Sequence, residues 1–238
     1  MGDGITSHEG EPDYAKALHQ HSVYCNVLEK SGLELTILDS DPNHPDGCFV
    51  EDTAIITEMC AIITNPGEKT RQGEQNHIQE ILSRVRKIEC IEPPATVEGG
   101  DVLRVGNHFY IGLSSRTNED GARRLASLLS RYGFTSSPVH VQTALHLKTG
   151  VTYVGNKTIV CTDEFAGRKE FRNLSAIIVD SSERYAANCL AINGIVLIPK
   201  GSPRLKEKLQ ALGHKIKEVD MSEFKKMDGG LTCLSLLF

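Results

Sequence analysis

A cysteine close to the end of the sequence has the surroundings of a reactive thiol. Cys233 comes shortly after the run Asp228-Gly229-Gly230. Such a run interrupts a helix, because glycine allows a positive φ and the close approach of another group to the backbone. A thiol on a turn of this kind is accessible to a substrate, whereas a core cysteine is not. The alternative is a small apolar residue in a C-terminal strand, which we expect over residues 231–237.

A histidine upstream could serve that thiol as a general acid and base. His146 lies between Leu145 and Leu147, and in a strand this alternation would point its side chain to the opposite face from both leucines. Next to a cysteine, an imidazole can accept and return a proton during nucleophilic catalysis. A purely structural histidine is the alternative, and the residues alone leave both interpretations open.

Two acidic motifs occupy matching positions along the chain. Glu51 and Asp52 precede one apolar run, and Glu98-Gly99-Gly100-Asp101 precedes another. Acidic residues at strand starts often cap or turn the chain, and that structural interpretation stays open. Their recurrence in two segments favours a shared function. Carboxylates brought together in this way indicate a cationic substrate.

Two arginines also occupy matching positions. Arg71 and Arg116 each lie in the loop that leads into a predicted helix. Loop arginines are ordinarily solvated. A matched pair could instead hold a carboxylate through bidentate hydrogen bonds.

The composition narrows the class of protein. The chain has 238 residues, a formal net charge of −5, 5% aromatic residues and no tryptophan, so neither a basic surface nor a base-stacking platform for nucleic acid is expected. No apolar run reaches the ~18 residues that a membrane span requires. The seven cysteines form no C-x-x-C pair, which is typical of free thiols in a reducing compartment. We therefore expect a cytoplasmic protein that binds neither nucleic acid nor a membrane.

A repeated module accounts for most of the sequence, and we expect one α/β domain over residues 1–238. A helix is predicted at 11–31 and a strand at 33–38; modules of strand, tight turn, strand, loop and helix follow, with helices predicted at 74–85, 119–132 and 204–212. The modules recur every 40–50 residues, roughly, which suggests radial repetition of a ββαβ unit about an axis. An ordinary α/β sheet with hairpins is the alternative. Repetition would bring the strand starts together in one pocket, and these carry Glu51, Asp52, Glu98, Asn188 and Asp228.

Motifs that extend along the whole chain carry a resemblance to a known family. They are Pro12-Asp13-Tyr14-Ala15-Lys16-Ala17-Leu18, Pro45-Asp46-x-x-Phe49-Val50-Glu51-Asp52, Thr96-Val97-Glu98-x-Gly100-Asp101, Phe109-Tyr110-Ile111-Gly112 with Arg116-Thr117-Asn118, Leu145-His146-Leu147-Lys148-Thr149-Gly150, Tyr185-Ala186-Ala187-Asn188-Cys189 and Asp228-Gly229-Gly230-x-x-Cys233. In this combination the chain closely resembles the bacterial dimethylarginine dimethylaminohydrolases, which belong to the guanidine-modifying (pentein) superfamily.

The resemblance implies a fold and a site. The fold would be a five-bladed α/β propeller of ββαβ units. Family members usually carry further residues before Asp3, so the first strand would be missing if the protein began where this sequence does. The implied catalytic residues are Cys233 as the nucleophile, His146 as the general acid and base, and Glu98. The resemblance also implies substrate-binding positions. Glu51 and Asp52, with Glu98, would bind a guanidinium group. Asp46 would bind an α-amino group, Arg71 and Arg116 would bind an α-carboxylate, and backbone carbonyls near Ile5 and Met227 would complete the pocket.

The activity implied by the resemblance is hydrolysis of Nω-methylated arginines, asymmetric dimethylarginine and monomethylarginine, to citrulline and a methylamine. It would pass through an S-alkylthiouronium on Cys233 and would need no metal or organic cofactor. Relatives are often homodimers, so a homodimer is expected. Two alternatives stay open: another guanidine-modifying reaction, such as arginine deiminase-like hydrolysis or amidino transfer, and a non-catalytic binding module with the same fold.

Overall fold

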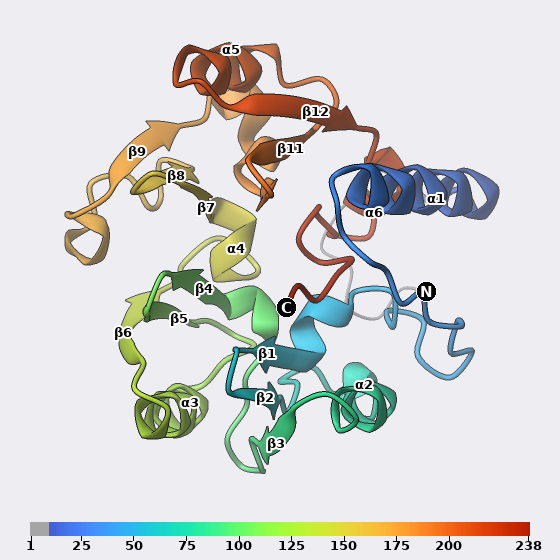
Figure 1. Ribbon diagram of the computed structural model, residues 1–238, viewed down its shortest axis with the longest axis vertical. Coiled ribbons are helices and arrows are strands. Elements are labelled where there is room, and N and C mark those ends of the chain that lie inside the picture. Colours follow the sequence, from blue (N-terminus) through green and yellow to red (C-terminus); the bar gives the residue numbers. More distant parts are fainter. Residues whose placement is uncertain (1–9) are drawn as a thin grey trace. The chain divides into compact units, whose positions relative to one another are not determined.

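The computed structural model describes residues 10–238 and divides into two compact units. Figure 1 labels most helices and strands of both. Unit 1 comprises Ser40–Thr149 and Cys233–Phe238, and the described part of unit 2 comprises residues 10–39 and Gly150–Thr232. Neither unit is one continuous segment of chain. The division leaves the expectation of a single domain as a prediction, and each unit is described by itself.

Unit 1 contains two three-stranded sheets of the same topology. In each sheet the first two strands form an antiparallel hairpin, and the third strand, which follows a helix, pairs parallel to the second. The first set of elements is β1 (Ala54–Ile56), β2 (Cys60–Ile63), α2 (Gln75–Leu82) and β3 (Lys87–Cys90); the second is β4 (Val102–Val105), β5 (His108–Leu113), α3 (Glu119–Arg131) and β6 (Thr135–His140).

Helix α3 shows why these segments fold as they do. The Asn118 side chain accepts a hydrogen bond from Gly121 N and thereby caps the first turn, and acidic residues follow in that turn, where the helix dipole favours them. One face of the helix carries buried leucines at helical spacing, which pack in a core with Phe109 and Phe134. Full burial of a leucine side chain contributes ~1.5–3 kcal/mol, so this face holds the helix against its sheet.

Unit 2 contains two further sheets of this topology. Its elements are α1 (Tyr14–Lys30), β7 (Val151–Gly155), β8 (Thr158–Cys161), η4 (Lys169–Phe171), β9 (Ser175–Ile178), β10 (Leu190–Ile192), β11 (Ile195–Pro199), α5 (Pro203–Ala211), β12 (Lys215–Val219) and α6 (Ser222–Lys225). In the sheet of β7, β8 and β9 the short 3-10 turn η4 replaces the helix. No helix in the described part of the chain is long and apolar enough to span a bilayer.

A short helical turn precedes the first strand of every one of these sheets. These turns are η1 (Val50–Thr53) before β1, η3 (Gly99–Asp101) before β4, α4 (Leu147–Gly150) before β7 and η5 (Ser181–Ala187) before β10. The acidic motifs of the sequence lie on or beside η1 and η3. The fold therefore presents its candidate functional residues from equivalent places in repeated modules.

The predicted α/β fold of repeated ββαβ units is confirmed. The helices predicted at 11–31, 74–85, 119–132 and 204–212 are all present, with ends that differ by at most three residues. The strands predicted at 33–38 and 231–237 are wrong, because within residues 10–238 neither segment pairs with a strand. Burial alternates along 33–36 as in a strand, but a strand also requires a ladder partner.

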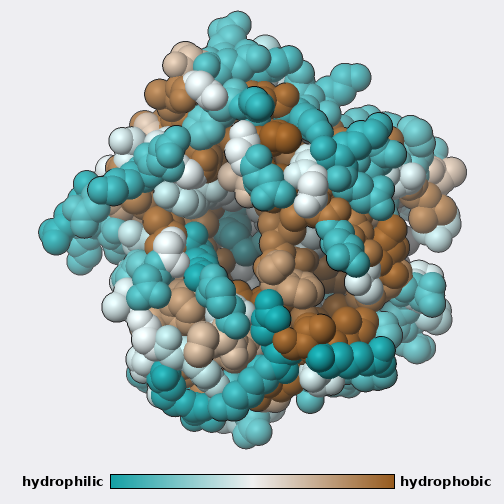
Figure 2. Space-filling model, viewed as in Figure 1, coloured by the Kyte–Doolittle hydropathy of each residue, from teal (hydrophilic) through white to brown (hydrophobic). Residues whose placement is uncertain are grey.

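The surface is ordinary for a globular protein of this composition. The face shown in Figure 2 mixes hydrophilic residues with scattered apolar patches. Among the exposed large apolar side chains, Tyr14 and Leu18 lie one turn apart on α1, with 63% and 54% of their surface exposed. The seven cysteines, which all lie within the described residues, form no disulfide.

Candidate active site

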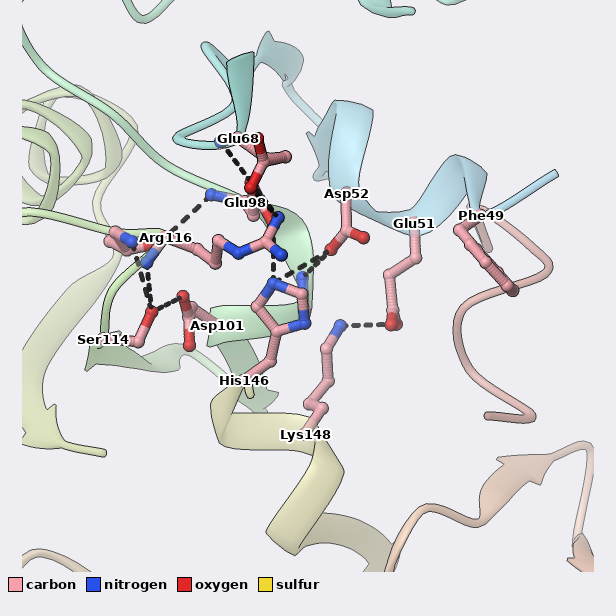
Figure 3. Close-up of polar contacts among 12 residues, drawn as sticks. Phe49, Glu51, Asp52, Glu68, Glu98, Asp101, Ser114, Arg116, His146 and Lys148 are labelled. Atoms are coloured by element: carbon pink, nitrogen blue, oxygen red, sulfur yellow. Dashed lines mark hydrogen bonds and ion pairs between the residues drawn. The ribbon is translucent and has the colours of Figure 1, made fainter. Parts of the chain in front are cut away.

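Three ionisable side chains from different turns of unit 1 meet in a buried cluster. Asp52 lies on η1, Glu98 immediately precedes η3, and His146 immediately precedes α4. His146 Nε2 lies 2.6 Å from Glu98 Oε2 and 4.0 Å from Asp52 Oδ1 (Figure 3). Glu98 is fully buried, and Asp52 and His146 are 3% and 6% exposed. The sequence placed all three among the site residues, and the structure brings them together.

Two adjacent glycines allow this close approach. A Cβ on Gly100 would lie 2.8 Å from Asp52 Oδ1 and 2.8 Å from Nδ1 of His146. A Cβ on Gly99 would lie 1.9 Å from the carbonyl oxygen of Glu51. Gly100 N also donates a hydrogen bond of 2.8 Å to Asp52 Oδ1. The two glycines of the Glu-Gly-Gly-Asp motif therefore allow η3 to pack against both the Asp52 carboxylate and the His146 imidazole.

The cluster holds a proton on the imidazole at neutral pH. Burial lowers the pKa of His146, but the charge of Asp52, the hydrogen bond with Glu98 and the charge of Asp101 outweigh burial and raise that pKa to about 9. Burial raises the pKa of Asp52, but His146 and Arg71 outweigh it and lower the pKa to about 2. Burial raises the pKa of Glu98, but the hydrogen bond with His146 and the charges of His146 and Arg116 together outweigh it and lower that pKa. The resting site is an imidazolium between carboxylates.

Asp101 fixes the segment that carries the histidine. Its Oδ1 accepts a hydrogen bond of 2.9 Å from Leu147 N, and its Oδ2 accepts one of 2.6 Å from Ser114 Oγ. Burial raises the pKa of this carboxyl group. A Cβ on Gly112 would lie 2.7 Å from Asp101 Oδ1, so the carboxyl group fits closely. Asp101 was not predicted as a site residue, although its motif had been singled out in the sequence.

Arg71 is buried and bound to carboxylates of the protein. Its Nη1 lies 2.5 Å from Asp52 Oδ2, its Nη2 donates to Glu74 Oε2 at 2.7 Å, and Nη2 also donates to the carbonyl oxygen of Phe49 at 3.1 Å. This arginine therefore supports the guanidinium-binding candidate Asp52 directly. Its predicted contact with a substrate carboxylate would have to form beside these bonds, and it stays a prediction.

Arg116 lies on the other side of Glu98. Its Nη1 is 3.6 Å from Glu98 Oε1 and 3.6 Å from Glu68 Oε2. The backbone N–H of Glu68 donates to Glu98 Oε1 at 3.1 Å. The two arginines, which occupy matching loop positions, each lie next to one carboxylate of the cluster: Arg71 beside Asp52 and Arg116 beside Glu98.

The backbone of η1 is bonded to the candidate nucleophile. Glu51 N donates a hydrogen bond of 3.1 Å to the carbonyl oxygen of Cys233. The Glu51 carboxylate is bound by Lys148, whose Nζ lies 2.6 Å from Oε1 (Figure 3). Cys233 itself is partly exposed, as a thiol that must meet a substrate requires. Lys148 was missed by sequence reasoning, although it stands two residues after His146.

Three further candidates for substrate binding are Asp46, Met227 and Ile5. Asp46 is partly exposed in the loop before η1, where its charge contributes, after burial, to raising the pKa of Cys48 to about 12. Met227 is partly exposed in unit 2, and its N–H donates to Phe224 O at 2.9 Å. Ile5 lies outside the described residues. The predicted substrate contacts of all three stay predictions.

Two local expectations were wrong. His146 does not lie in a strand but at the start of the helical turn α4, where its N–H donates to Thr149 Oγ1 at 3.3 Å. In the turn before Cys233 the positive φ, 59°, belongs to Asp228 and not to Gly229 or Gly230. Asp is among the residues that tolerate this left-handed conformation.

This arrangement suits nucleophilic chemistry on a cation. The ligand atoms of Asp52, Glu98 and His146 lie within 4.8 Å of one another. A metal ion could bind there only after the imidazole loses its proton, which a pKa of about 9 opposes at neutral pH. The same carboxylates can instead receive the N–H groups of a cationic substrate, while the imidazolium supplies a proton to a departing group.

Comparisons with known proteins agree on one family. Residues 6–189 match the family described as N,N dimethylarginine dimethylhydrolase, eukaryotic. The chain is 46% identical over 239 residues to the N(G),N(G)-dimethylarginine dimethylaminohydrolase of Pseudomonas aeruginosa, covering 99% of this chain and 94% of that protein.

Solved structures give the same result. A cysteine-to-serine mutant of the Pseudomonas aeruginosa enzyme complexed with citrulline superposes with a TM-score of 0.97 at 44% identity, covering 98% of this chain and 92% of that chain. A histidine-to-glycine dimethylarginine dimethylaminohydrolase, as an adduct with S-methyl-L-thiocitrulline, superposes with a TM-score of 0.96 at 44% identity, covering 98% and 93%.

Proposed function

The chain belongs to the dimethylarginine dimethylaminohydrolase family, and from this premise we propose that it hydrolyses Nω-methylated arginines to citrulline and a methylamine with Cys233 as nucleophile. The observation that carries the proposal is the buried cluster in which His146 Nε2 lies 2.6 Å from Glu98 and 4.0 Å from Asp52. A guanidine hydrolase needs carboxylates for the cation and a proton donor for the amine, and this cluster supplies both.

Binding is the first step that these residues explain. An alkylated guanidinium is a weak electrophile, because its charge is delocalised over three nitrogens. Carboxylate oxygens of Asp52 and Glu98 would accept hydrogen bonds from its N–H groups and hold its central carbon towards the sulfur of Cys233, which replaces a bimolecular encounter by an oriented one. Arg71 keeps Asp52 ionised and in place.

The chemistry then proceeds through a covalent intermediate. The thiolate attacks the guanidinium carbon and forms a C–S bond. His146 gives its proton to the departing methylamine nitrogen as the C–N bond breaks, which leaves an S-alkylthiouronium on Cys233. The neutral imidazole next takes a proton from water, which attacks the same carbon. The C–S bond of the resulting tetrahedral adduct breaks and restores the thiolate, the remaining hydroxyl proton passes to solvent, and citrulline leaves.

The spacing of two residues in the relatives supports these roles. The cysteine replaced in the citrulline complex and the histidine replaced in the thiocitrulline adduct are numbered 249 and 162 in those chains, so they are 87 positions apart. Positions 233 and 146 of this chain, occupied by Cys233 and His146, are also 87 apart. Asp46, Arg71 and Arg116, together with carbonyls near Ile5 and Met227, are proposed to bind the amino-acid end of the substrate.

Domain organisation, location and assembly follow from features outside the cluster. We expect residues 1–238 to act as one hydrolase domain, because both units are assembled from segments that interleave along the chain. The lack of disulfides among the cysteines fits a cytoplasmic enzyme. The exposed apolar residues of α1, Tyr14 and Leu18, are candidates for the contact in a homodimer.

A parallel citrulline assay tests the function. The protein is incubated with asymmetric dimethylarginine, monomethylarginine and arginine, and Cys233→Ser serves as control. We expect citrulline from both methylated substrates and none from the variant. Comparable or faster turnover of arginine would replace the proposed substrate class by that of an arginine deiminase-like enzyme. A folded wild-type protein that yields no citrulline from any of the three would refute the enzymatic proposal.

A further inference from the structure

The chain just before Cys233 is fastened by side chains far away in the sequence. Tyr185 Oη donates a hydrogen bond of 2.8 Å to the carbonyl oxygen of Gly229, and Tyr24 Oη donates one of 2.8 Å to the carbonyl oxygen of Leu231. Tyr24 is 1% exposed, so its hydroxyl group is fixed in the core. Both carbonyl groups are thus hydrogen-bonded to tyrosine side chains of unit 2, to which Gly229 and Leu231 themselves belong.

Asn188 makes a reciprocal pair with the residue next to the cysteine. Its Nδ2 donates to Thr232 Oγ1 at 3.0 Å, and Thr232 N donates to its Oδ1 at 3.0 Å. Both residues are buried. A Cβ on Gly230 would lie 2.6 Å from Cγ of Asn188, so this glycine is required because the amide side chain packs directly against the turn.

The bond on the far side of this segment completes the restraint. The carbonyl oxygen of Cys233 accepts from Glu51 N at 3.1 Å. The peptide group between Leu231 and Thr232 and the one after Cys233 are therefore both held, which restricts the directions that the Cα–Cβ bond of Cys233 can take. A turn that also contains two glycines would otherwise sample many conformations, at a cost of ~1–2 kcal/mol for each residue that has to be ordered.

We propose that Asn188, assisted by Tyr24 and Tyr185, is a positioning residue that aims the thiol of Cys233. The inference rests on the proposed function, because it takes Cys233 as the nucleophile. Asn188 touches neither substrate nor the reacting atoms in this account; it acts through Thr232. Its loss should therefore reduce the rate of attack while the carboxylates that bind the guanidinium remain in place. A misplacement of about 1 Å can lower a rate on the order of 100-fold.

Isosteric substitutions distinguish an effect on the orientation of the Cys233 thiol from an effect on folding. Thr232→Val removes the hydroxyl partner of Asn188 at nearly constant volume, and Thr232→Ser restores it. Asn188→Ala removes both hydrogen bonds of the pair. The matched control is Tyr153→Phe, which removes one hydrogen bond, from Lys157 N to Tyr153 Oη at 3.1 Å, at a place in unit 2 outside the turn. Thermal unfolding of each variant gives the folded fraction.

We expect Asn188→Ala and Thr232→Val to lower kcat by about 10- to 100-fold, with KM within about twofold of the wild-type value. Thr232→Ser should keep most of the wild-type kcat, and Tyr153→Phe should show no loss of kcat. Alkylation of Cys233 by 2-chloroacetamidine, mapped by mass spectrometry, should slow in the same order. Unchanged kcat and alkylation rates in Asn188→Ala and Thr232→Val overturn the proposal, as does an equal loss in Tyr153→Phe. An inactive wild type contradicts the proposed function, whereas the alkylation rates still decide whether Asn188 positions the thiol.

Discussion

Replacing Glu98 by Gln tests the electrostatic account of His146 directly. The pKa of His146 is about 9, against an ordinary value of 6.5, and a shift of this size corresponds to roughly 3 kcal/mol in favour of the imidazolium. Asp52, Glu98 and Asp101 share in that shift. An opposite charge at hydrogen-bonding distance typically accounts for ~1–3 pKa units. Glu98→Gln keeps the shape of the side chain but removes its charge, so we expect the pKa of His146 to fall by about 1–2 units.

The assay is an NMR titration of the imidazole ring protons between pH 5 and 10. The His146 resonance is assigned by its absence in His146→Gln. Glu89→Gln is the matched control, because it removes a carboxylate from the surface ion pair of Glu89 with Arg131 and should leave the titration of His146 unchanged. The same His146 pKa in Glu98→Gln and wild type would refute the reasoning that the buried carboxylates hold the proton.

Further predictions concern stability and packing. Because the folded-state pKa of His146 is raised from 6.5 to about 9, the stabilisation it gives is complete below pH 6.5 and is lost as pH rises to about 9. Urea unfolding should show the free energy of unfolding declining by up to roughly 3 kcal/mol over that range. An equal decline in His146→Gln would contradict this. The pKa of Asp52 is lowered to about 2, so its contribution is present above pH 3.8 and lost as pH falls to about 2; Asp52→Asn should flatten the acid limb of the unfolding profile. Gly100→Ala places a Cβ 2.8 Å from both Asp52 and His146, so we expect a loss of ~1–3 kcal/mol in unfolding free energy and a large fall in kcat; unchanged kinetics would show that the cluster tolerates displacement. Lys148→Met removes the ammonium group bound to Glu51, which should lower the urea midpoint by an amount equivalent to ~1–3 kcal/mol, and a midpoint at or above the wild-type value would exclude a stabilising ion pair.

The repeated arrangement of the site could be predicted because it is written in local motifs. An acidic residue before a short apolar run recurs at Glu51-Asp52 and Glu98, and the structure places the first pair on, and Glu98 directly before, a helical turn that leads into the first strand of its sheet. The two arginines also follow the repeat, each before a helix. Such signals depend on neighbours in the sequence, so one sequence is sufficient to find them.

The contacts between these motifs could not be predicted in the same way. That Asp101 would bind Leu147 N, or that Arg71 would bridge Asp52 and Glu74, depends on how separate turns pack. Nothing in the spacing of the residues encodes those partners. Asn188 is a similar case, since its pairing with Thr232 joins positions separated by 44 residues.

Short patterns account for the local errors. The alternation around His146 spans three residues, and a helical turn closed by Thr149 satisfies it equally well. In the turn before Cys233 two glycines drew the prediction of a positive φ, but Asp228 adopts it. Gly230 is required for a different reason, the close approach of the Asn188 side chain. The prediction of a turn with a positive φ and a required glycine was correct. Which residue fills each role depended on tertiary packing.

Mass spectrometry of the protein during turnover tests the central claim, covalent catalysis by Cys233, most directly. Wild-type protein is mixed with asymmetric dimethylarginine, quenched in acid within the first turnovers and examined intact and after digestion. The account predicts an adduct with the mass of the substrate less dimethylamine on the peptide that contains Cys233, and no adduct in Cys233→Ser. An adduct on another cysteine, or citrulline formation by Cys233→Ser at the wild-type rate, would contradict it.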